Sequence, residues 1–192
     1  MKILLIAATS DEIINEYFSN SEILISGVGM INTTYELTKR LTSNSYDLVI
    51  NIGVAGCFNP TLKTGDVVEV IEDNFSEIGF ENGVGFEQFS DFKIETIYSV
   101  DEKTDLQKVK GITVNTIHGN EDSIAKIVHR LNPDVESMEG AAVFKVCKEF
   151  NVPCLQIRAI SNKVEKRNKE NWDLPLAIKN LNTTVSQIIT KL

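Results

Sequence analysis

The chain has 192 residues, of which 42% are hydrophobic and 24% are charged, and its formal net charge at neutral pH is −8. This composition is that of a folded globular protein that can bury a core of its own. The acidic balance repels phosphate groups, so we expect neither nucleic acid nor a membrane surface as a partner.

Short apolar runs alternate along the chain with longer amphipathic ones. In chain order the pattern predicts strands at 3–8 and 22–26, a helix at 31–43, strands at 48–52, 67–71 and 111–117, a helix at 122–131, a strand at 135–138, a helix at 139–150, a strand at 154–160 and a helix at 174–189. Residues 74–93 contain three glycines, which predicts a loop or lid. Together these elements predict a single domain, 1–192, with a layered α/β fold around a largely parallel sheet.

The cysteines and histidines offer no plausible metal site. Cys57, Cys147 and Cys154 form no CxxC pair, and two histidines are too few to complete a zinc site with them. Unpaired thiols are typical of the reducing cytoplasm. The apolar run at 3–8 is too short for a signal peptide, and no segment approaches the roughly 20 apolar residues that cross a bilayer. We therefore expect a cytoplasmic protein without a bound metal.

Two glycine-containing turns follow predicted strands, which makes a dinucleotide or phosphate site worth testing. The turn Gly27-Val28-Gly29 lacks the third glycine of a dinucleotide fingerprint, because Asn32 stands there. Neither turn continues into the Gly-Lys-Ser/Thr of a P-loop. On these residues alone, the simpler interpretation is that the glycines permit tight turns from strand to helix.

The second turn, Gly53-Val54-Ala55-Gly56, is followed by Leu62-Lys63-Thr64-Gly65-Asp66, and this combination resembles the nucleoside phosphorylase and nucleosidase superfamily. The resemblance implies a three-layer α/β/α fold with a central mixed, largely parallel sheet, in which Val54, Ala55 and Gly56 bind substrate. Phosphorolytic members typically have arginine in place of Asn51 and serine in place of Val54. A phosphate dianion needs charge-assisted donors, so the resemblance indicates water as the nucleophile.

Further segments match the same superfamily in the same order: a strand leading to Glu12, then Val135-Glu136-Ser137-Met138-Glu139-Gly140-Ala141, then Arg158-Ala159-Ile160-Ser161-Asn162. These segments, with 164–172 and 75–83, are most similar to the futalosine hydrolase family of the alternative menaquinone pathway. The resemblance implies an enzyme that cleaves the purine–ribose bond of futalosine and releases hypoxanthine and dehypoxanthine futalosine. It also implies no metal or organic cofactor, and a homo-oligomer of at least two chains.

Asn162 bears on the identity of the base. The related methylthioadenosine/S-adenosylhomocysteine nucleosidases have aspartate at this position, and a carboxylate facing O6 of hypoxanthine would oppose two acceptors at a cost of roughly 1–3 kcal/mol. An asparagine amide donates to O6 and accepts from a protonated N7 at once. Asn162 therefore indicates a 6-oxopurine nucleoside. The alternative is that this asparagine only stabilises a turn at the strand end.

Glu12 is the candidate general base. Glycoside cleavage passes through a cation resembling an oxocarbenium ion, and a positioned carboxylate that takes a proton from water contributes about 10²- to 10⁴-fold. Thr9-Ser10-Asp11-Glu12 also fits the capping-box pattern, in which the glutamate only satisfies a backbone N–H. With the other motifs present, catalysis is the favoured interpretation.

Glu139, Met138 and Arg158 complete the predicted sugar site. An ionised Glu139 at a helix start can accept hydrogen bonds from the 2′ and 3′ hydroxyls, although a carboxylate there also has the simpler role of a favourable N-terminal charge. By resemblance, Met138 lies against the sugar, where a buried core methionine is the alternative. Arg158 would help to hold the attacking water; a structural salt bridge is the alternative.

The 5′ substituent of futalosine carries an aromatic carboxylate, which favours a cation and an apolar wall. Lys166, Arg167 and Lys169 with Trp172 form the densest basic-aromatic cluster of the chain. We expect Arg167 and Trp172, with the loop at 75–89, to line the 5′ pocket; a solvated charged face is the alternative. The base-stacking wall is expected from residues 118–124.

Three alternatives to futalosine hydrolysis remain open. A methylthioadenosine/S-adenosylhomocysteine nucleosidase that tolerates Asn162 is the nearest. A non-catalytic nucleoside-binding protein is disfavoured by the presence of both Glu12 and Glu139, since a sensor needs no base to activate water. A phosphorylase would depend on phosphate for turnover.

Overall fold

The computed structural model describes residues 1–83, 85–89 and 92–192. The strands are β1 (Ile3–Ala7), β2 (Glu22–Ile25), β3 (Leu48–Cys57), β4 (Val67–Phe75), β5 (Phe80–Glu81), β6 (Phe86–Glu87), β7 (Ile97–Ser99), β8 (Gln107–Thr113), β9 (Val135–Ser137) and β10 (Cys154–Lys163). The α-helices are α1 (Met30–Ser43), α2 (Glu121–Leu131), α3 (Gly140–Glu149) and α4 (Leu174–Lys191), and short 3₁₀ helices cover Ser10–Glu12, Asn15–Tyr17 and Lys169–Asn171.

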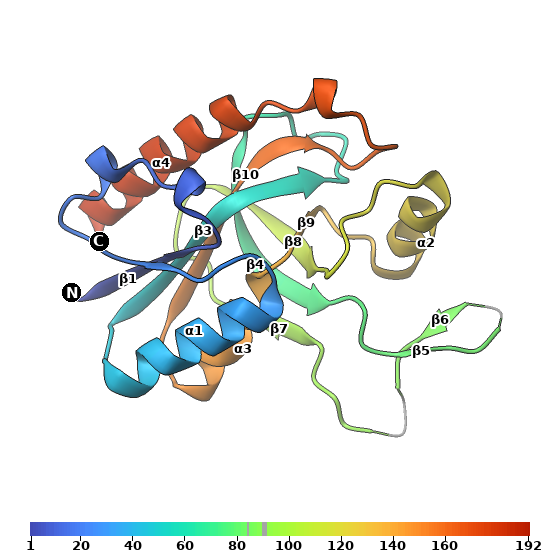
Figure 1. Ribbon diagram of the computed structural model, residues 1–192, viewed down its shortest axis with the longest axis horizontal. Coiled ribbons are helices and arrows are strands. Elements are labelled where there is room, and N and C mark those ends of the chain that lie inside the picture. The colour runs from blue at the N-terminus through green and yellow to red at the C-terminus, as the bar shows by residue number, and fades with distance from the viewer. Residues whose placement is uncertain (84, 90–91) are drawn as a thin grey trace.

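The central sheet is mixed and largely parallel, as predicted. Its strand order is β10-β4-β8-β9-β3-β1-β2, with β7 added beside β4 and a further pairing that joins β10 to β3. The strands β3, β9, β8, β4 and β10 therefore form a closed ring. Parallel pairing joins β1 to β2, β1 to β3, β3 to β10, β4 to β8 and β8 to β9. Helix α4 covers one face of the sheet and α1 and α3 cover the other (Figure 1), so the predicted three-layer α/β/α fold is confirmed.

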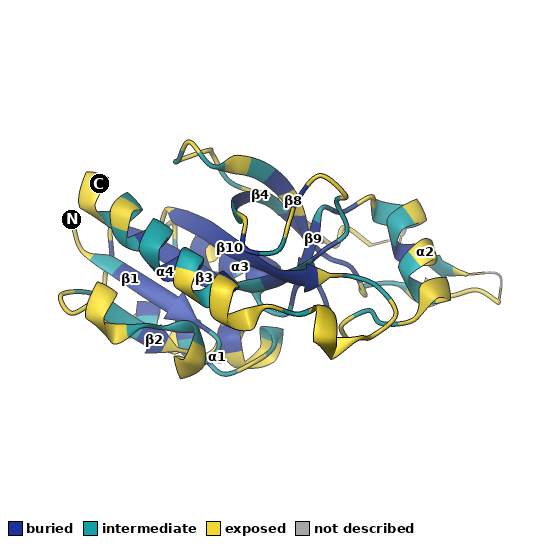
Figure 2. Cartoon of the chain, turned by 90° about the horizontal axis from the view of Figure 1, so that it is seen from above, coloured by how far each residue is buried: buried dark blue, intermediate teal, exposed yellow. Residues whose placement is uncertain are grey.

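Alternate residues of β1 explain why this strand is uninterruptedly apolar. Leu4 and Ile6 pack into the hydrophobic cluster that includes side chains of α1 and α3, whereas Leu5 and Ala7 pack into the cluster that includes α4. A strand covered on both faces buries both sets of side chains. Figure 2 shows the strands as the buried centre of the molecule, between helices with exposed outer faces.

Three predicted boundaries are wrong, and the strand pairing explains each. The predicted turn at 53–56 lies inside β3, because these residues pair with β10 and, at Gly56, with β9. Strand β10 continues to Lys163 through a register shift between Ile160 and Asn162. Strand β8 begins at Gln107 and ends at Thr113, earlier than predicted, because it pairs with β4 from Val68 onward.

The predicted loop at 74–93 contains a short hairpin. Strand β4 continues to Phe75, and β5 pairs with β6 beyond it. Arg130 of α2 donates to the backbone carbonyl of Ser76 at 2.7 Å and lies over the ring of Phe86. The predicted lid also includes residues 84 and 90–91, which lie outside the described residues.

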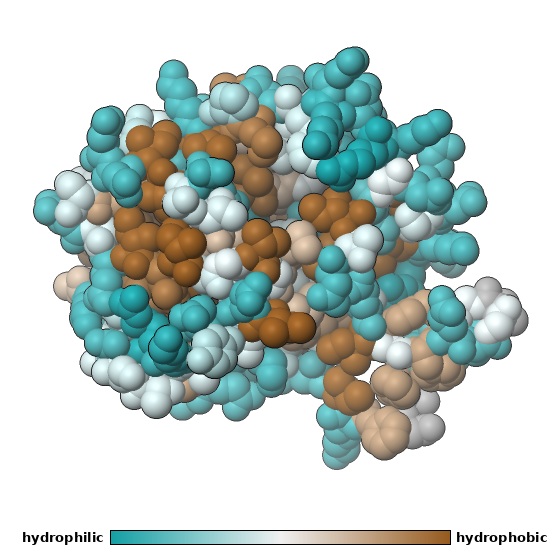
Figure 3. All heavy atoms as spheres, in the orientation of Figure 1, coloured by the Kyte–Doolittle hydropathy of each residue, from teal (hydrophilic) through white to brown (hydrophobic). Residues whose placement is uncertain are grey.

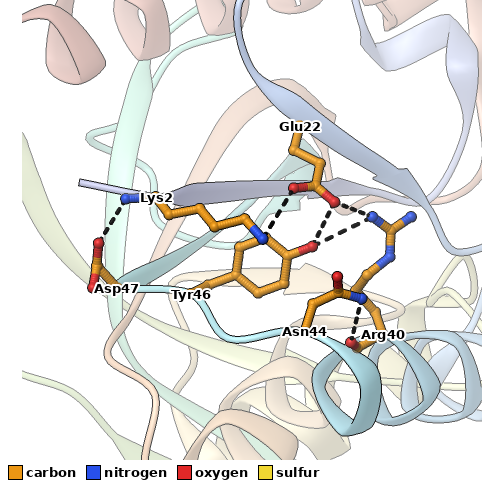
Figure 4. A network of polar contacts seen from close by, with 6 residues as sticks. All are labelled: Lys2, Glu22, Arg40, Asn44, Tyr46 and Asp47. Carbon is orange, nitrogen blue, oxygen red and sulfur yellow. Dashed lines mark hydrogen bonds and ion pairs between the residues drawn. The ribbon is translucent and has the colours of Figure 1, made fainter.

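A polar network at the amino-terminal ends of β1 and β2, opposite the carboxyl ends of these strands, ties β1, β2 and α1 together (Figure 4). Glu22 of β2 accepts hydrogen bonds from the hydroxyl of Tyr46, at 2.6 Å, and from Arg40 of α1. The Tyr46 bond is the main reason why the pKa of Glu22 lies below its ordinary value. The backbone N–H of Lys2 donates to the Asp47 carboxylate, and the backbone N–H of Asp47 donates to the carbonyl of Lys2.

Among the described residues, no helix combines the length and the apolar character that crossing a membrane requires. The three cysteines are buried and free.

Candidate active site

A cavity of about 310 Å³ lies at the ends of β1, β3, β9 and β10. Glu12 and Glu139, the two glutamates that the sequence singled out, both line it. The other lining residues are Ala8, Thr9, Asp11, Val28, Val54, Ala55, Gly56, Ile117, Glu136, Ser137, Met138, Ser161, Asn162, Trp172, Leu174 and Ile178. Segments distant in sequence meet here because the carboxyl ends of the parallel strands β1, β3 and β10 share one sheet edge, and β9 pairs antiparallel with the end of β3.

Glu12 makes the capping-box contacts and also reaches the next strand. Its Oε2 accepts the backbone N–H of Thr9 at 3.1 Å, as the capping pattern predicts, at the start of the 3₁₀ helix Ser10–Glu12. Its Oε1 accepts the backbone N–H of Val54 in β3 at 3.1 Å. The cap therefore fixes the carboxylate in one orientation at the cavity, and the two interpretations of Glu12 are compatible.

Arg158 is buried behind the cavity rather than lining it. Only 1% of the residue is exposed, and its guanidinium donates to Asn51 Oδ1 at 3.3 Å and to Ser137 Oγ at 3.5 Å. A Cβ placed on Gly53 would lie 2.7 Å from Arg158 Nη1 and 2.8 Å from Glu12 Oε1. The missing side chain at Gly53 thus lets the cation and the carboxylate approach the same point of β3.

Glu139 does not cap the helix that it precedes. It is the N-cap residue of α3, but its side chain turns away and its Oε1 accepts the backbone N–H of Gly29 at 2.9 Å. Burial raises the pKa of Glu139, the positive charge of Arg158 and the Gly29 hydrogen bond lower it, and the charge of Glu12 raises it. The first glycine turn therefore supplies a backbone donor to the carboxylate, besides starting α1.

Helix α3 approaches the sheet closely at Gly140. A Cβ on this residue would lie 2.1 Å from Asp73 Oδ2 and 2.4 Å from Gln156 Nε2. Asp73 accepts hydrogen bonds from Thr113 Oγ1 at 2.8 Å and from Gln156 Nε2 at 2.9 Å, and Thr113 Oγ1 in turn accepts the N–H of Ala141. This buried group holds the helix start that presents Glu139 to the cavity.

Asn162 lies within β10 rather than in a turn beyond it. Its Oδ1 accepts the hydroxyl of Ser161 at 2.8 Å, and its Nδ2 donates to the carbonyl of Lys163 at 2.8 Å. An amide has two N–H groups and two oxygen lone pairs, so one donor and one acceptor position remain for a ligand. Its backbone partner in β3 is Gly56, where a Cβ would press on Val164.

Sequence reasoning missed the group formed by Glu136 and His118. Glu136 lines the cavity although only 2% of it is exposed, and His118 contacts its carboxylate through the backbone N–H at 3.1 Å and through Nδ1 at 2.6 Å. The base wall predicted at 118–124 is not part of the lining; Ile117 lines the cavity instead. His118 turns toward Glu136, and α2 begins at Glu121.

The structure brings together only some of the residues that were predicted to line the 5′ pocket. Trp172 lines the cavity, whereas Arg167 is exposed and places its guanidinium 5.2 Å from the centre of the Trp172 ring. The described residues of 75–89 are absent from the lining, because that segment pairs into the β5–β6 hairpin next to α2.

Comparisons with known proteins agree with this fold. A family model described as the phosphorylase superfamily matches residues 13–191. The chain is similar to the 5′-methylthioadenosine/S-adenosylhomocysteine nucleosidase of Neisseria meningitidis in complex with methylthio-immucillin-A, with a TM-score of 0.85, 21% identity and full coverage of both chains. It is similar to the futalosine hydrolase of Helicobacter pylori strain 26695, with a TM-score of 0.87, 19% identity and coverage of 100% of this chain and 98% of that one.

A third similar structure is the nucleosidase of Colwellia psychrerythraea in complex with adenine, with a TM-score of 0.84, 21% identity and coverage of 100% and 96% of the two chains. At these identities the solved structures establish the fold, while the family model covers almost all of the sequence. The chain therefore belongs to the phosphorylase superfamily and is an enzyme of that superfamily.

Proposed function

We propose that the protein is a nucleosidase that hydrolyses the bond between a 6-oxopurine and ribose. The observation that carries this proposal is that Glu12 and Glu139 share one cavity of about 310 Å³. In this proposal Glu139 accepts hydrogen bonds from the vicinal hydroxyls of the sugar. Glu12, which contacts β3, faces C1′ of the sugar. Arg158 acts as a positioning residue, because its charge lies beside Glu12 without lining the cavity.

Hydrolysis needs a proton taken from water and a proton given to the departing base. Glu12 accepts the proton of the attacking water as its oxygen bonds to C1′. The electron pair of the C1′–N9 bond moves into the purine, which takes a proton at N7 from solvent water and leaves as the neutral base, while the proton on Glu12 returns to solvent after the product departs. Asn162 stabilises that form through its free acceptor position and donates to O6. The developing ribosyl cation lies between two carboxylates, whose negative charge stabilises it.

Water rather than phosphate is the proposed nucleophile. Asn51 is neutral and buried, and Val54 offers only its backbone N–H, which Glu12 already accepts. Arg158 is a nearby cation, but its positive charge already interacts with the carboxylates of Glu139 and Asp73, whose pKa values it lowers. A phosphate dianion would have to enter a site that contains two glutamates, and that like-charge contact opposes its binding.

Futalosine is the substrate that we propose within the 6-oxopurine class, with Trp172 as the apolar wall for its aromatic 5′ group and Arg167 as the cation behind that ring. A methylthioadenosine/S-adenosylhomocysteine nucleosidase is the second candidate. The similarity to solved nucleosidases of that specificity favours it. Asn162 favours the first candidate, because its amide matches O6.

One assay separates these functions. The purified protein is incubated with futalosine, inosine and methylthioadenosine, with and without phosphate, and the free base is measured by chromatography. We expect hypoxanthine release from futalosine, at a rate that phosphate does not change. Adenine release alone would support the second candidate. Release that requires phosphate would show a phosphorylase, and no release from any substrate would contradict the enzymatic proposal.

We also propose that the protein forms a dimer or larger homo-oligomer through the outer face of α1. An apolar groove of about 650 Å³ there is lined by residues that include Met30, Ile31 and Tyr35. The side chains of Ile31 and Tyr35 are exposed, and Figure 3 shows large apolar areas on the surface of the molecule. The groove and the cavity are close in sequence, because Met30 lines the groove and Val28, two residues earlier, lines the cavity. Ile31→Glu should shift the mass measured by analytical ultracentrifugation to that of a monomer; a wild-type monomer would contradict this.

A further inference from the structure

Asn182 is a polar residue of α4 that the steps of hydrolysis leave unused. It is fully buried, and it is not among the described residues that line the cavity. We propose that Asn182 is a positioning residue for the reaction, which holds the backbone of Glu12 so that the carboxylate of this glutamate meets the attacking water. This inference rests on the proposed nucleosidase function and assigns the group that fixes its general base.

The side-chain amide of Asn182 bonds to the chain on both sides of Ile13. Its Oδ1 accepts the backbone N–H of Ile14 at 2.8 Å, and its Nδ2 donates to the backbone carbonyl of Glu12 at 2.9 Å and to that of Ile178 at 2.7 Å. An amide has two N–H groups and one acceptor oxygen, so these bonds use both donors and the oxygen. Figure 1 shows the short helical turns that follow β1 lying against α4.

Packing of α4 alone does not explain an asparagine at this place. The neighbouring side chains Leu181 and Val185 pack into the apolar cluster that also contains Leu5 of β1. Burial of an amide is unfavourable unless hydrogen bonds replace those that it made with water. Asn182 makes these replacement bonds with the backbone of the Glu12 segment and of its own helix.

The segment that carries Glu12 needs support from outside. Ser10–Glu12 is a single turn of 3₁₀ helix, in which the bond from the N–H of Glu12 to the carbonyl of Thr9 is 3.4 Å long. Hydrogen bonds in a 3₁₀ turn have poorer geometry than those in an α-helix, and the last carbonyls of a helix have no partner within it. Asn182 supplies such a partner to the carbonyl of Glu12, from a helix that packs on the sheet.

The bonds to the carboxylate itself do not replace this support during the reaction. The N–H groups of Thr9 and Val54 donate to the carboxylate of Glu12. Hydrogen bonds to an ionised acceptor are roughly twice as strong as those to a neutral one, so both weaken when Glu12 takes the proton of the water. The bonds of Asn182 join neutral backbone groups, whose charge this transfer does not change. Asn182 therefore holds Glu12 in both of its protonation states.

Asn182→Ala tests this assignment. The variant loses the bonds to the Glu12 segment, while alanine favours the helix more than asparagine does. A misplacement of about 1 Å at a reacting centre can cost about 10²-fold in rate, so we expect kcat for inosine to fall by about 10- to 100-fold. KM should stay within about 3-fold of wild type, because Glu12 acts on the water whereas Glu139 holds the sugar.

The matched control is Asn180→Ala, which removes the same kind of bond from the same helix. Asn180 Nδ2 donates to the backbone carbonyl of Gly65 at 2.8 Å, and Asn180 is also outside the described lining of the cavity. Urea denaturation should show a lower free energy of unfolding for both variants, whereas kcat should fall only in Asn182→Ala. A fall of kcat that both variants share would overturn the proposal.

A double variant separates positioning from a general structural effect. If Asn182 acts through Glu12, Asn182→Ala should change the residual rate of Glu12→Gln by less than about 3-fold. An equal loss with and without Glu12 would overturn the proposal, as would a wild-type kcat in Asn182→Ala. If Asn182→Ala does not fold, Asn182→Ser takes its place in every comparison, because a hydroxyl has one donor and cannot make both donations of the amide.

Hydrogen exchange keeps this test separate from that of the nucleosidase activity. The N–H of Val54 donates to Glu12 Oε1, so NMR should show faster exchange at Val54, relative to the rest of β3, in Asn182→Ala than in wild type and in Asn180→Ala. If wild type releases no base from any nucleoside, the proposed function fails. Faster exchange confined to Asn182→Ala would still support the positioning of Glu12, and unchanged exchange at Val54 would overturn it.

Discussion

Replacing Gly53 with alanine places one methyl group between the two charged side chains that the proposed reaction needs. The new Cβ would lie 2.7 Å from Arg158 Nη1 and 2.8 Å from Glu12 Oε1, where ordinary van der Waals contact begins at 3.4 Å. Each group must retreat by about 0.6–0.7 Å, because repulsion rises steeply at shorter distances. Both atoms are at the ends of side chains, so the backbone of β3 can stay in place.

The expected damage is therefore catalytic more than structural. A misplacement of about 1 Å at a reacting centre can cost about 10²-fold in rate, and we expect a fall in kcat/KM for inosine of that size. Overpacking of a buried site costs about 1–3 kcal/mol. Because the ends of the Arg158 and Glu12 side chains can move, we expect Gly53→Ala to lower the free energy of unfolding by an amount at the lower end of that range.

The assay compares kcat/KM from hypoxanthine release with the free energy of unfolding from urea denaturation. Gly85→Ala is the matched control, because a Cβ at this glycine meets nothing within 4 Å. It should leave both quantities within error of wild type. A Gly53→Ala variant that keeps kcat/KM within about 3-fold of the control would refute the assignment of the reacting centre to this part of β3.

Three further changes test other parts of the site. Glu12→Gln keeps an acceptor for the N–H of Thr9 but places its amide against the N–H of Val54, so the free energy of unfolding should fall by about 1–3 kcal/mol, while base release falls about 10²- to 10⁴-fold. Activity equal to that of wild type would leave Glu12 only its capping role. Burial raises the pKa of Asp73 to about 6 from 3.8, although Gln156 and Thr113 lower it. Since its folded-state pKa is raised, the stability due to protonated Asp73 is complete below 3.8 and is lost as the pH rises through about 6. Urea denaturation should show Asp73→Asn without this decline, which amounts to about 3 kcal/mol at most; parallel pH profiles would contradict it. Arg167→Ala should raise the KM for futalosine about 5-fold and leave that for inosine unchanged; equal effects on both substrates would remove Arg167 from the 5′ site.

The layered fold could be predicted because it depends on local patterns, whereas the convergence of Glu12 and Glu139 was implied by the resemblance to the superfamily. Alternating strands and helices bring strand ends together at one edge of the sheet, and each glutamate follows or lies beside such an end. The shared cavity also depends on the strand order β9-β3-β1 and β10-β3, which only the structure shows.

The extent of β3 could not be predicted in the same way. Gly53 and Gly56 read as a turn because glycine weakens strands. They are held in the sheet by β9 and β10, which come 79 or more residues later in the chain. The ring that these strands close is a tertiary feature without a local signal.

Glu136 was missed for a related reason. It lies in a strand of only three residues, Val135–Ser137, where a charged residue reads as solvent-facing. Its burial depends on His118, which arrives from the loop before α2 and covers the carboxylate. The geometric sign that Glu136 faces the cavity is its pairing with Gly56 of the neighbouring strand β3. That register appears only in the folded chain.

A crystal structure of the Glu12→Gln variant with inosine bound would show whether both glutamate positions serve one sugar. We expect both hydroxyls of the ribose within hydrogen-bond distance of the Glu139 carboxylate, and residue 12 facing C1′ across a space that one water fills. Inosine bound outside this cavity, or with its base rather than its sugar against Glu139, would contradict the proposed mechanism.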